Sequence, residues 1–351
     1  MATIKLGQRA IGPGEAPFII AELSGNHDQS LDKALAMVDA AAKCGADAIK
    51  VQTYTADSMT LDIQHGEFVI QEVGNLWQGQ SLYQLYQQAM TPWDWHQAIF
   101  ERAQQHGMLA FSTPFDQAAV DFLEQLNVPC YKIASFENSD HALLAAVAKT
   151  GKPVIMSTGM ATQTELAESV EVLRKNGCDA LILLKCTSHY PADPVDANLA
   201  TIPHLAQLFG CQVGLSDHSA GIGVAVASVV LGASVIEKHF VLSRAEGGVD
   251  AEFSLEPAEF SALVQECKRA AVALGKVTYG GTDKEQASRK YRRSLYIAED
   301  MQAGDIFTTE NLRSVRPGLG LEPKYLSLFM GKCIKKAASK GTPLDWYHLS
   351  D

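Results

Sequence analysis

Two histidines are well placed for chemistry, because each ends a short segment typical of a buried parallel strand. His218 closes residues 214–218 (GLSDH), and His239 lies near the end of residues 235–240 (VIEKHF). Residues 220–231 between them predict a helix, so the two strands should be neighbours. Two imidazoles at adjacent strand ends can share one divalent metal ion. Taken alone, two unrelated polar strand ends explain the pattern equally well.

The rest of the chain repeats the same rhythm, in which a short apolar run is followed by an amphipathic stretch. This pattern is typical of parallel strands covered by helices. Eight such runs predict a TIM (β/α)8 barrel; they span residues 18–21, 48–51, 109–111, 130–133, 154–156, 180–184, 212–215 and 234–236. Apolar residues at helical spacing predict further helices over 31–44, 94–106, 117–126, 142–150, 164–176 and 257–274.

Two parts of the chain depart from this rhythm. Residues 55–91 are too long for an ordinary strand-to-helix loop and rich in aromatic side chains, which favours an active-site lid or, equally, a packing insertion. After the helix that ends near residue 274, short strand-like pieces alternate with turns. We therefore predict a barrel domain over 1–280, a linker over 281–291 and a small separate domain over 292–351.

The bulk composition is that of a globular protein, with 47% hydrophobic and 20% charged residues in a chain of 351. A net charge of −11 argues against nucleic acid as a partner, because phosphate backbones require a basic face. Seven cysteines without CxxC spacing indicate reduced thiols. No segment resembles a secretion signal or a membrane span. We expect a soluble cytoplasmic protein that does not bind membranes.

In a TIM barrel the carboxyl ends of the strands carry the chemistry, so the polar residues there can be considered together. Glu22 ends the first strand, where a carboxylate can orient a sugar, move a proton or pair with a lysine. Glu237 could bind a metal, orient a histidine or form an ion pair. Lysines and hydroxyls recur at the other strand ends, which is typical of a phosphate-bearing substrate, although each hydroxyl alone could be a helix N-cap: Lys50, Ser112, Thr113, Lys132, Ser135, Ser157, Thr158, Lys185, Thr187 and Ser188.

Two rival functions remain compatible with these residues. Lys50, Lys132 and Lys185 permit a Schiff-base pyruvate aldolase with one buried lysine as nucleophile. The small terminal domain permits a non-catalytic carbohydrate-binding protein. The pair of histidines weighs against both rivals.

Eight short motifs of the sequence occur in the same order in one known family. They are residues 20–22 (IAE), 26–27 (NH), 50–53 (KVQT), 112–115 (STPF), 131–133 (YKI), 157–160 (STGM), 214–218 (GLSDH) and 237–240 (EKHF). On these motifs the sequence resembles the sialic acid synthase family over essentially its whole length. Residues 22–27 (ELSGNH), 52–57 (QTYTAD) and 83–96 are most similar to the branch that makes pseudaminic acid. The branches that make N-acetylneuraminic acid or legionaminic acid are the alternatives.

This resemblance implies a TIM barrel followed by an antifreeze-like, or SAF, domain. It also implies a domain-swapped homodimer, in which the small domain of one chain caps the barrel of the other. The implied reaction is a metal-dependent condensation of phosphoenolpyruvate with the open-chain aldehyde of an amino sugar and water. Its products are a nine-carbon 2-keto acid and phosphate.

The resemblance also implies roles for individual residues. His218 and His239 match the ligands of Mn2+ or Mg2+, and with Glu22 they form the catalytic group. The sugar would contact Gln52, Tyr190 and Asp250, together with Arg316 from the partner chain. Ser188 departs from the sialic acid branch, which commonly has asparagine there. The phosphoenolpyruvate site would comprise Lys50, Thr113, Lys132, Ser135, Ser157, Ser188 and Ser216.

Overall fold

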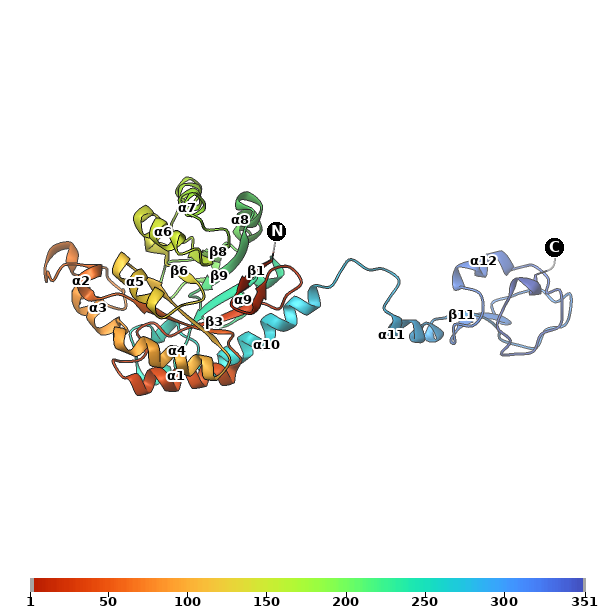
Figure 1. The fold of residues 1–351 in the computed structure, drawn as a ribbon. Helices are drawn as coiled ribbons and strands as arrows, with labels where there is room; N and C mark the ends of the chain where they lie inside the picture. Colours follow the sequence, from red (N-terminus) through yellow and green to blue (C-terminus); the bar gives the residue numbers. More distant parts are fainter. Residues whose placement is uncertain (1–2, 350–351) are drawn as a thin grey trace. The chain divides into compact units, whose positions relative to one another are not determined.

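The computed structural model describes residues 3–349, and the chain divides after Gly275 into two compact units, each described by itself (Figure 1). The first unit is a closed barrel in which the strands follow the order β10-β3-β4-β5-β6-β7-β8-β9. All of the neighbouring pairs are parallel, which confirms the predicted TIM barrel. The strands are β3 (Phe18–Glu22), β4 (Ala48–Thr53), β5 (Leu109–Pro114), β6 (Tyr131–Ile133), β7 (Val154–Ser157), β8 (Leu181–Cys186), β9 (Gln212–Asp217) and β10 (Val235–His239).

Most of the predicted helices are present around this barrel (Figure 1). The helix α8 was not predicted, and the helix expected over 220–231 is shorter in the structure. Ser30 begins the first of the helices by accepting a hydrogen bond from the Lys33 amide, and Gly45 ends it in the left-handed conformation. The helices are α1 (Leu31–Cys44), α4 (His96–Gln105), α5 (Gln117–Gln125), α6 (His141–Lys149), α7 (Gln163–Lys175), α8 (Thr201–Phe209), α9 (Gly223–Val230) and α10 (Pro257–Leu274).

Side chains of the strands alternate between the barrel interior and the surrounding helices. Lys132 of β6 and Glu237 of β10 meet at 3.3 Å although three strands separate β6 from β10, so both point into the interior. By the same alternation, Glu22 and Lys50 point into the interior, as do the apolar residues two positions before each, Ile20 and Ala48. Apolar side chains therefore fill the barrel below a charged layer at its carboxyl end.

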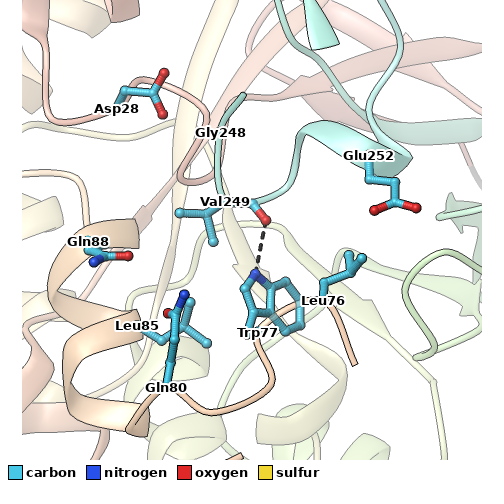
Figure 2. A pocket seen from close by; sticks show the side chains of 9 residues that line it. All are labelled: Asp28, Leu76, Trp77, Gln80, Leu85, Gln88, Gly248, Val249 and Glu252. Carbon is cyan, nitrogen blue, oxygen red and sulfur yellow. Dashed lines mark hydrogen bonds between the residues drawn. The ribbon is translucent and has the colours of Figure 1, made fainter. Parts of the chain in front are cut away.

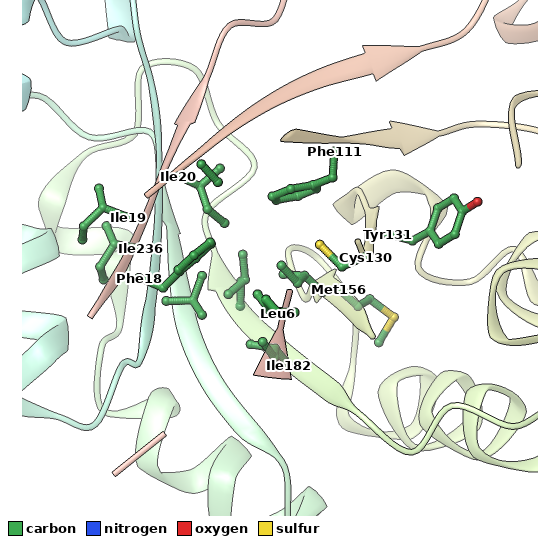
Figure 3. Close-up of a cluster of buried hydrophobic side chains, with 14 of the residues drawn as sticks. Leu6, Phe18, Ile19, Ile20, Phe111, Cys130, Tyr131, Met156, Ile182 and Ile236 are labelled. Atoms are coloured by element: carbon green, nitrogen blue, oxygen red, sulfur yellow. The ribbon is translucent and has the colours of Figure 1, made fainter. Parts of the chain in front are cut away.

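A hairpin that the sequence did not predict spans the amino end of the barrel. It consists of β1 (Ile4–Leu6) and β2 (Arg9–Ile11), and Leu6 lies fully buried within the barrel core (Figure 3). A methyl group added at Gly7 would come within 3.0 Å of Leu109, and one added at Gly12 within 3.1 Å of Gln212. Leu109 and Gln212 begin β5 and β9, which lie on opposite sides of the eight-stranded ring, so the hairpin reaches across it.

The long segment 55–91 contains two short helices, α2 (Ala56–Met59) and α3 (Leu82–Ala89), and one turn of 3-10 helix, η1 (Gly66–Phe68). A bridge between Val69 and Ser81 holds its middle part together. The indole of Trp77 donates a hydrogen bond of 3.0 Å to the carbonyl oxygen of Val249, which follows β10. The segment therefore contacts the loop that carries the chain from the last strand to α10.

The second unit has a small core of its own around an antiparallel pair, β11 (Ser294–Ile297) and β12 (Leu312–Val315). Two short helical pieces precede this pair, α11 (Asp283–Gln286) and η7 (Ala287–Tyr291). In the described part of the chain three more follow it, η8 (Pro323–Tyr325), α12 (Leu326–Phe329) and η9 (Trp346–His348). The core consists of Leu295, Ile297, Met301, Phe307, Leu312, Phe329, Ile334 and Leu344. In the described range 3–349, no helix combines the length and the apolar character needed to cross a membrane.

Gly214 of β9 provides a test of how closely the barrel strands pack. A methyl group there would collide with the Val235 carbonyl oxygen and come within 2.6 Å of Leu184. We expect Gly214→Ala to lower the free energy of unfolding by about 1–3 kcal/mol or more, because close-packed interiors do not accommodate an added methyl group. Thermal unfolding followed by circular dichroism measures the effect.

Gly223→Ala is the matched control for this substitution. Gly223 begins α9, and a methyl group there meets no other atom within 4 Å. The control should be neutral or slightly stabilising, since alanine favours helices. Equal melting temperatures for Gly214→Ala and the unmodified protein would contradict the proposed constraint.

Candidate active site

Two lysines and two glutamates form a buried network at the carboxyl end of the barrel. The Nζ atom of Lys50 lies 2.6 Å from Oε2 of Glu22 and 3.6 Å from Oε1 of Glu237. The Nζ atom of Lys132 lies 3.3 Å from the same oxygen of Glu237. None of the four residues is more than 3% exposed. Each charge therefore neighbours an opposite one, which offsets the cost of removing it from water.

The two glutamates of this network differ in proton affinity. Burial disfavours the charged form of Glu237, but Lys132 and Lys50 outweigh it and hold its pKa at about 2. Burial raises the pKa of Glu22 above its usual value, and Lys50 only partly opposes this. Glu237 thus remains a fixed anion between the lysines, whereas Glu22 is the carboxyl group suited to exchange a proton.

Neighbouring strands orient Glu22 and Lys50. The side-chain amide of Gln52 donates hydrogen bonds of 3.2 Å to Oε1 of Glu22 and 3.1 Å to the hydroxyl of Ser24. Lys50 donates a hydrogen bond of 3.3 Å to the hydroxyl of Thr113. The structure therefore brings together these predicted residues of β3, β4 and β5.

The two histidines predicted to bind a metal lie side by side, with ring centroids 5.2 Å apart. Nδ1 of His218 lies 3.0 Å from the carbonyl oxygen of Thr187 and can donate to it, which leaves Nε2 for a ligand. Nδ1 of His239 is buried and has no hydrogen-bond partner among residues 3–349. Burial lowers the pKa of His239, so its ring is neutral and can bind a cation through nitrogen.

An ion pair on the outer face of the same strands braces the two histidines. The buried Lys238, adjacent to His239, lies 2.7 Å from Oδ2 of Asp217, adjacent to His218. Oδ1 of Asp217 accepts hydrogen bonds of 2.9 and 2.6 Å from the amide and hydroxyl of Ser219. This pair therefore links the backbone segments that carry the two imidazoles.

Two aromatic rings and one carboxylate lie close to the histidines. Two of these three side chains, Tyr190 and Asp250, are predicted sugar contacts. The ring of Tyr190 lies 4.6 Å from that of His218, and Phe253 lies 4.8 Å from His239. Oδ2 of the buried Asp250 lies 3.9 Å from Nδ1 of His239. Tyr190 and Asp250 are therefore next to the histidine pair.

Two predicted serines, Ser135 and Ser188, lie against the backbone of Gly159, and a third, Ser157, precedes Gly159 by two residues. The hydroxyl of Ser135 accepts a 3.2 Å hydrogen bond from the Gly159 amide, and a methyl group added there would collide with the hydroxyl of Ser188. The buried hydroxyl of Ser157 has no hydrogen-bond partner in the described part of the chain. The cluster can thus offer hydroxyl donors to an anion. The hydroxyl of Ser216 donates to Glu237 at 2.9 Å.

Other predicted positions lie elsewhere. Ser112 and Thr158 donate hydrogen bonds to the carbonyl oxygens of Val51 and Leu184, so these hydroxyls support neighbouring strands. Arg316 belongs to the second unit, where it follows β12 and is exposed.

Sequence reasoning missed two residues of this site. Glu137 has a buried oxygen, Oε2, with no hydrogen-bond partner within residues 3–349, and burial raises its pKa to about 7 against the influence of Lys132. The thiol of Cys186 lies 3.9 Å from Nδ1 of His218. Cys186 could have been found as the interior residue that ends β8, whereas no pattern distinguishes Glu137.

Residues 37–279 match the NeuB family, and residues 292–350 match the SAF domain. The chain therefore belongs to the NeuB family, which confirms the resemblance to sialic acid synthases and the predicted SAF domain.

Named relatives place the chain more closely. It is 46% identical to the pseudaminic acid synthase of Campylobacter jejuni subsp. jejuni serotype O:23/36 (strain 81-176), covering 93% of this chain and 95% of the relative. It is 41% identical to the pseudaminic acid synthase of Helicobacter pylori (strain ATCC 700392 / 26695), covering 94% and 97%. The crystal structure of the N-acetylneuraminic acid synthetase from Leptospira borgpetersenii serovar Hardjo-bovis is similar at a TM-score of 0.73. That match has 34% identity and covers 82% of this chain and 95% of that one.

The raised pKa of Glu137 predicts a dependence of stability on pH. Between about pH 4.5 and pH 7 the folded protein keeps a proton that the unfolded chain releases, so stability falls as pH rises through this window. Glu137→Gln removes this penalty. Its stability relative to the unmodified protein should therefore grow by about 3 kcal/mol between pH 4 and pH 8, as measured by urea unfolding.

Glu168→Gln is the control, because Glu168 is an exposed glutamate of α7. Its stability relative to the unmodified protein should be the same at both pH values. A similarly constant difference for Glu137→Gln would show that Glu137 does not hold a proton in the folded state.

Proposed function

We propose that the chain condenses phosphoenolpyruvate with the open-chain aldehyde of 2,4-diacetamido-2,4,6-trideoxy-β-L-altropyranose and water, giving pseudaminic acid and phosphate. The main support is the position of the buried Lys50–Glu237–Lys132 network next to the histidine pair. The identity to pseudaminic acid synthases along nearly the whole chain favours this branch. The reaction would make the protein a transferase of the class that condenses phosphoenolpyruvate with C–O cleavage.

The anionic substrate would bind to the lysines and the serine cluster. Lys50 and Lys132 supply positive charge, which is held in place by Glu237 before the substrate arrives. Hydroxyl groups near these lysines would donate to the phosphate and carboxylate oxygens; they belong to Thr113, Ser135, Ser157, Ser188 and Ser216.

The histidine pair fits a divalent cation. The buried Nδ1 of His239 has no hydrogen-bond partner in the described chain, and a neutral imidazole nitrogen is a ligand for such ions. No cluster of three or more His, Cys, Asp or Glu side chains fit for a metal exists within residues 3–349, so water or substrate would complete the coordination. His218 and His239 would hold Mn2+ or Mg2+, which polarises a carbonyl oxygen when bound.

Glu22 would serve the proton transfers of this reaction. Carbon 3 of phosphoenolpyruvate forms a bond to the aldehyde carbon, the π bond of the aldehyde breaks and its oxygen gains a proton, and water adds to the cation left at carbon 2. Glu22 takes a proton from that water, as its raised pKa permits. The bond between carbon 2 and the phosphate oxygen of the resulting tetrahedral intermediate then breaks, the carbon 2 hydroxyl becomes the keto group, and its proton leaves with the phosphate.

The sugar would lie beside the histidines. Gln52, Tyr190 and Asp250 would contact it. Arg316 of a second copy would complete the site in a domain-swapped homodimer.

Charge pairing makes the Schiff-base aldolase less favourable. Burial lowers the pKa of Lys50, but its ion-pair partners Glu22 and Glu237 outweigh burial and raise the pKa, so Lys50 is not a free amine. The Nζ atom of Lys185 donates to the carbonyl oxygen of Cys186.

Phosphate release from phosphoenolpyruvate tests the proposed function. With Mn2+ and the 2,4-diacetamido altrose sugar the protein should release phosphate, and it should release none with chelator or without a sugar. Release with N-acetylmannosamine alone would instead make it an N-acetylneuraminate synthase. Release of no phosphate with any sugar would contradict both assignments.

The variant His218→Ala should lose more than about 100-fold in this assay, since even indirect partners of metal ligands contribute 10- to 100-fold. His204→Ala is the control, because His204 is an exposed histidine of α8. Unchanged turnover in His218→Ala would refute the assigned role of the histidine pair.

Gly159→Ala tests the serine cluster as the anion site. The added methyl group would lie 2.7 Å from the hydroxyl of Ser135 and collide with that of Ser188. We expect KM for phosphoenolpyruvate to rise by about 10-fold, equivalent to roughly 1.4 kcal/mol, with KM for the sugar unchanged. Gly223→Ala should leave both constants unchanged. An equal rise in both KM values for Gly159→Ala would place the anion elsewhere.

A further inference from the structure

Asn26 belongs to one of the eight sequence motifs, residues 26–27 (NH), and has so far been given no role. It follows β3 in the chain and is fully buried. Its amide nitrogen, Nδ2, donates hydrogen bonds of 3.0 Å to the carbonyl oxygen of Phe240 and 2.8 Å to the hydroxyl of Ser254. Its oxygen, Oδ1, accepts one of 3.1 Å from the backbone amide of Asp250. The side chain therefore connects the end of β3 to the loop that follows β10.

These hydrogen bonds allow only one orientation of the Asn26 amide. A backbone carbonyl can only accept a hydrogen bond, and a backbone N–H can only donate one. Nδ2 must therefore face Phe240, and Oδ1 must face Asp250. A methyl group added at Gly248 would lie 2.9 Å from Oδ1, so the backbone of this loop lies close to the amide. Asn26 thus matches its surroundings in both shape and polarity.

The partners of Asn26 define the position of Asp250. Phe240 directly follows His239, one of the two histidines of the site. The Ser254 hydroxyl, which accepts from Asn26, donates a hydrogen bond of 2.6 Å to the carbonyl oxygen of Asp250. The N–H of Asp250 is therefore tied to Asn26 directly, and its C=O through Ser254. This arrangement places Oδ2 of Asp250 3.9 Å from Nδ1 of His239.

Two further contacts hold the same turn of the chain. The carboxylate of Asp250 accepts a hydrogen bond of 3.5 Å from the backbone amide of Gly25. The indole of Trp77 donates to the carbonyl oxygen of Val249, the residue before Asp250 (Figure 2). Asn26 bonds both to this turn and to Phe240, and so ties the turn to the end of the strand that carries His239.

We propose that Asn26 is a positioning residue for the acceptor sugar, because it holds the Asp250 carboxyl group in a fixed place beside His239. This inference rests on the proposed function, in which Asp250 contacts the sugar. A carboxyl group binds a hydroxyl or an amide only where its oxygens are correctly placed. A loop free to move would hold Asp250 in that place for part of the time, which weakens the affinity for the sugar in proportion. Phosphoenolpyruvate, bound by lysines and serines of other strands, should not be affected.

The variant Asn26→Asp tests this role at nearly unchanged volume, because it replaces the donor Nδ2 by an oxygen that faces the carbonyl oxygen of Phe240. We expect kcat/KM for the 2,4-diacetamido altrose sugar to fall about 3- to 10-fold, as for the loss of one neutral hydrogen bond, with KM for phosphoenolpyruvate unchanged. Asn127→Asp is the matched control, because Asn127 is an exposed asparagine between α5 and β6, and it should change neither value.

Combining this variant with Asp250→Asn distinguishes positioning from a general effect on the fold. If Asn26 acts through the carboxyl group of Asp250, Asn26→Asp should lower kcat/KM for the sugar no further once Asp250→Asn has removed that group. Losses that multiply in the double variant would overturn the positioning role.

Ser254→Ala protects the test against misfolding of Asn26→Asp. It removes only the hydroxyl between Asn26 and Asp250, and it should lower kcat/KM for the sugar in the same direction. An unchanged value in folded Ser254→Ala, or an equal rise in KM for phosphoenolpyruvate, would overturn the positioning role and leave the proposed function intact. Failure of the unmodified protein to convert the sugar would overturn the proposed function and the positioning role together.

Discussion

The burial of four charges at the mouth of the barrel is the constraint on which the rest of the site depends. Glu22, Lys50, Lys132 and Glu237 are almost fully removed from water, and this is tolerable only while each charge faces an opposite one. A shift of one residue in the register of any contributing strand would turn its charge toward the helices. The closed barrel is therefore also the device that sets the distances within the site.

On the outer face of β9 and β10, too, buried charges are paired with opposite ones. Asp217 and Lys238 form a buried pair between the barrel and its helices, while the residues next to them, His218 and His239, belong to the site. Removing one partner of such a pair commonly costs about 3–5 kcal/mol, because it leaves an uncompensated charge. The same short segments therefore stabilise the fold and set the distance between the two imidazoles.

The alternation of strands and helices could be predicted because buried parallel strands are continuous apolar runs. The same rule ended several strands too early: Gln52 belongs to β4 but is polar, since the interior becomes polar at its carboxyl end. The β1–β2 hairpin was missed because strands of three residues are too short to show a period. The polar residues of the site were predicted from their positions at strand ends and from family motifs.

The buried, unpartnered oxygens of Glu137 and Gln80 could not be predicted from the sequence. Nothing in their local pattern distinguishes them from ordinary surface residues. Each stands out only because folding buries one of its oxygens without giving it a partner, which depends on segments distant in the chain. Trp77 is similar, because its contact with Val249 joins residues 172 positions apart.

The β1–β2 hairpin determines which end of the barrel is open to solvent. With Leu6 and Ile11 buried in its amino end, that end is plugged, and exchange with solvent takes place through the carboxyl-end mouth. In the proposed reaction, phosphoenolpyruvate and the sugar would therefore enter, and pseudaminic acid and phosphate would leave, at the same end of the barrel.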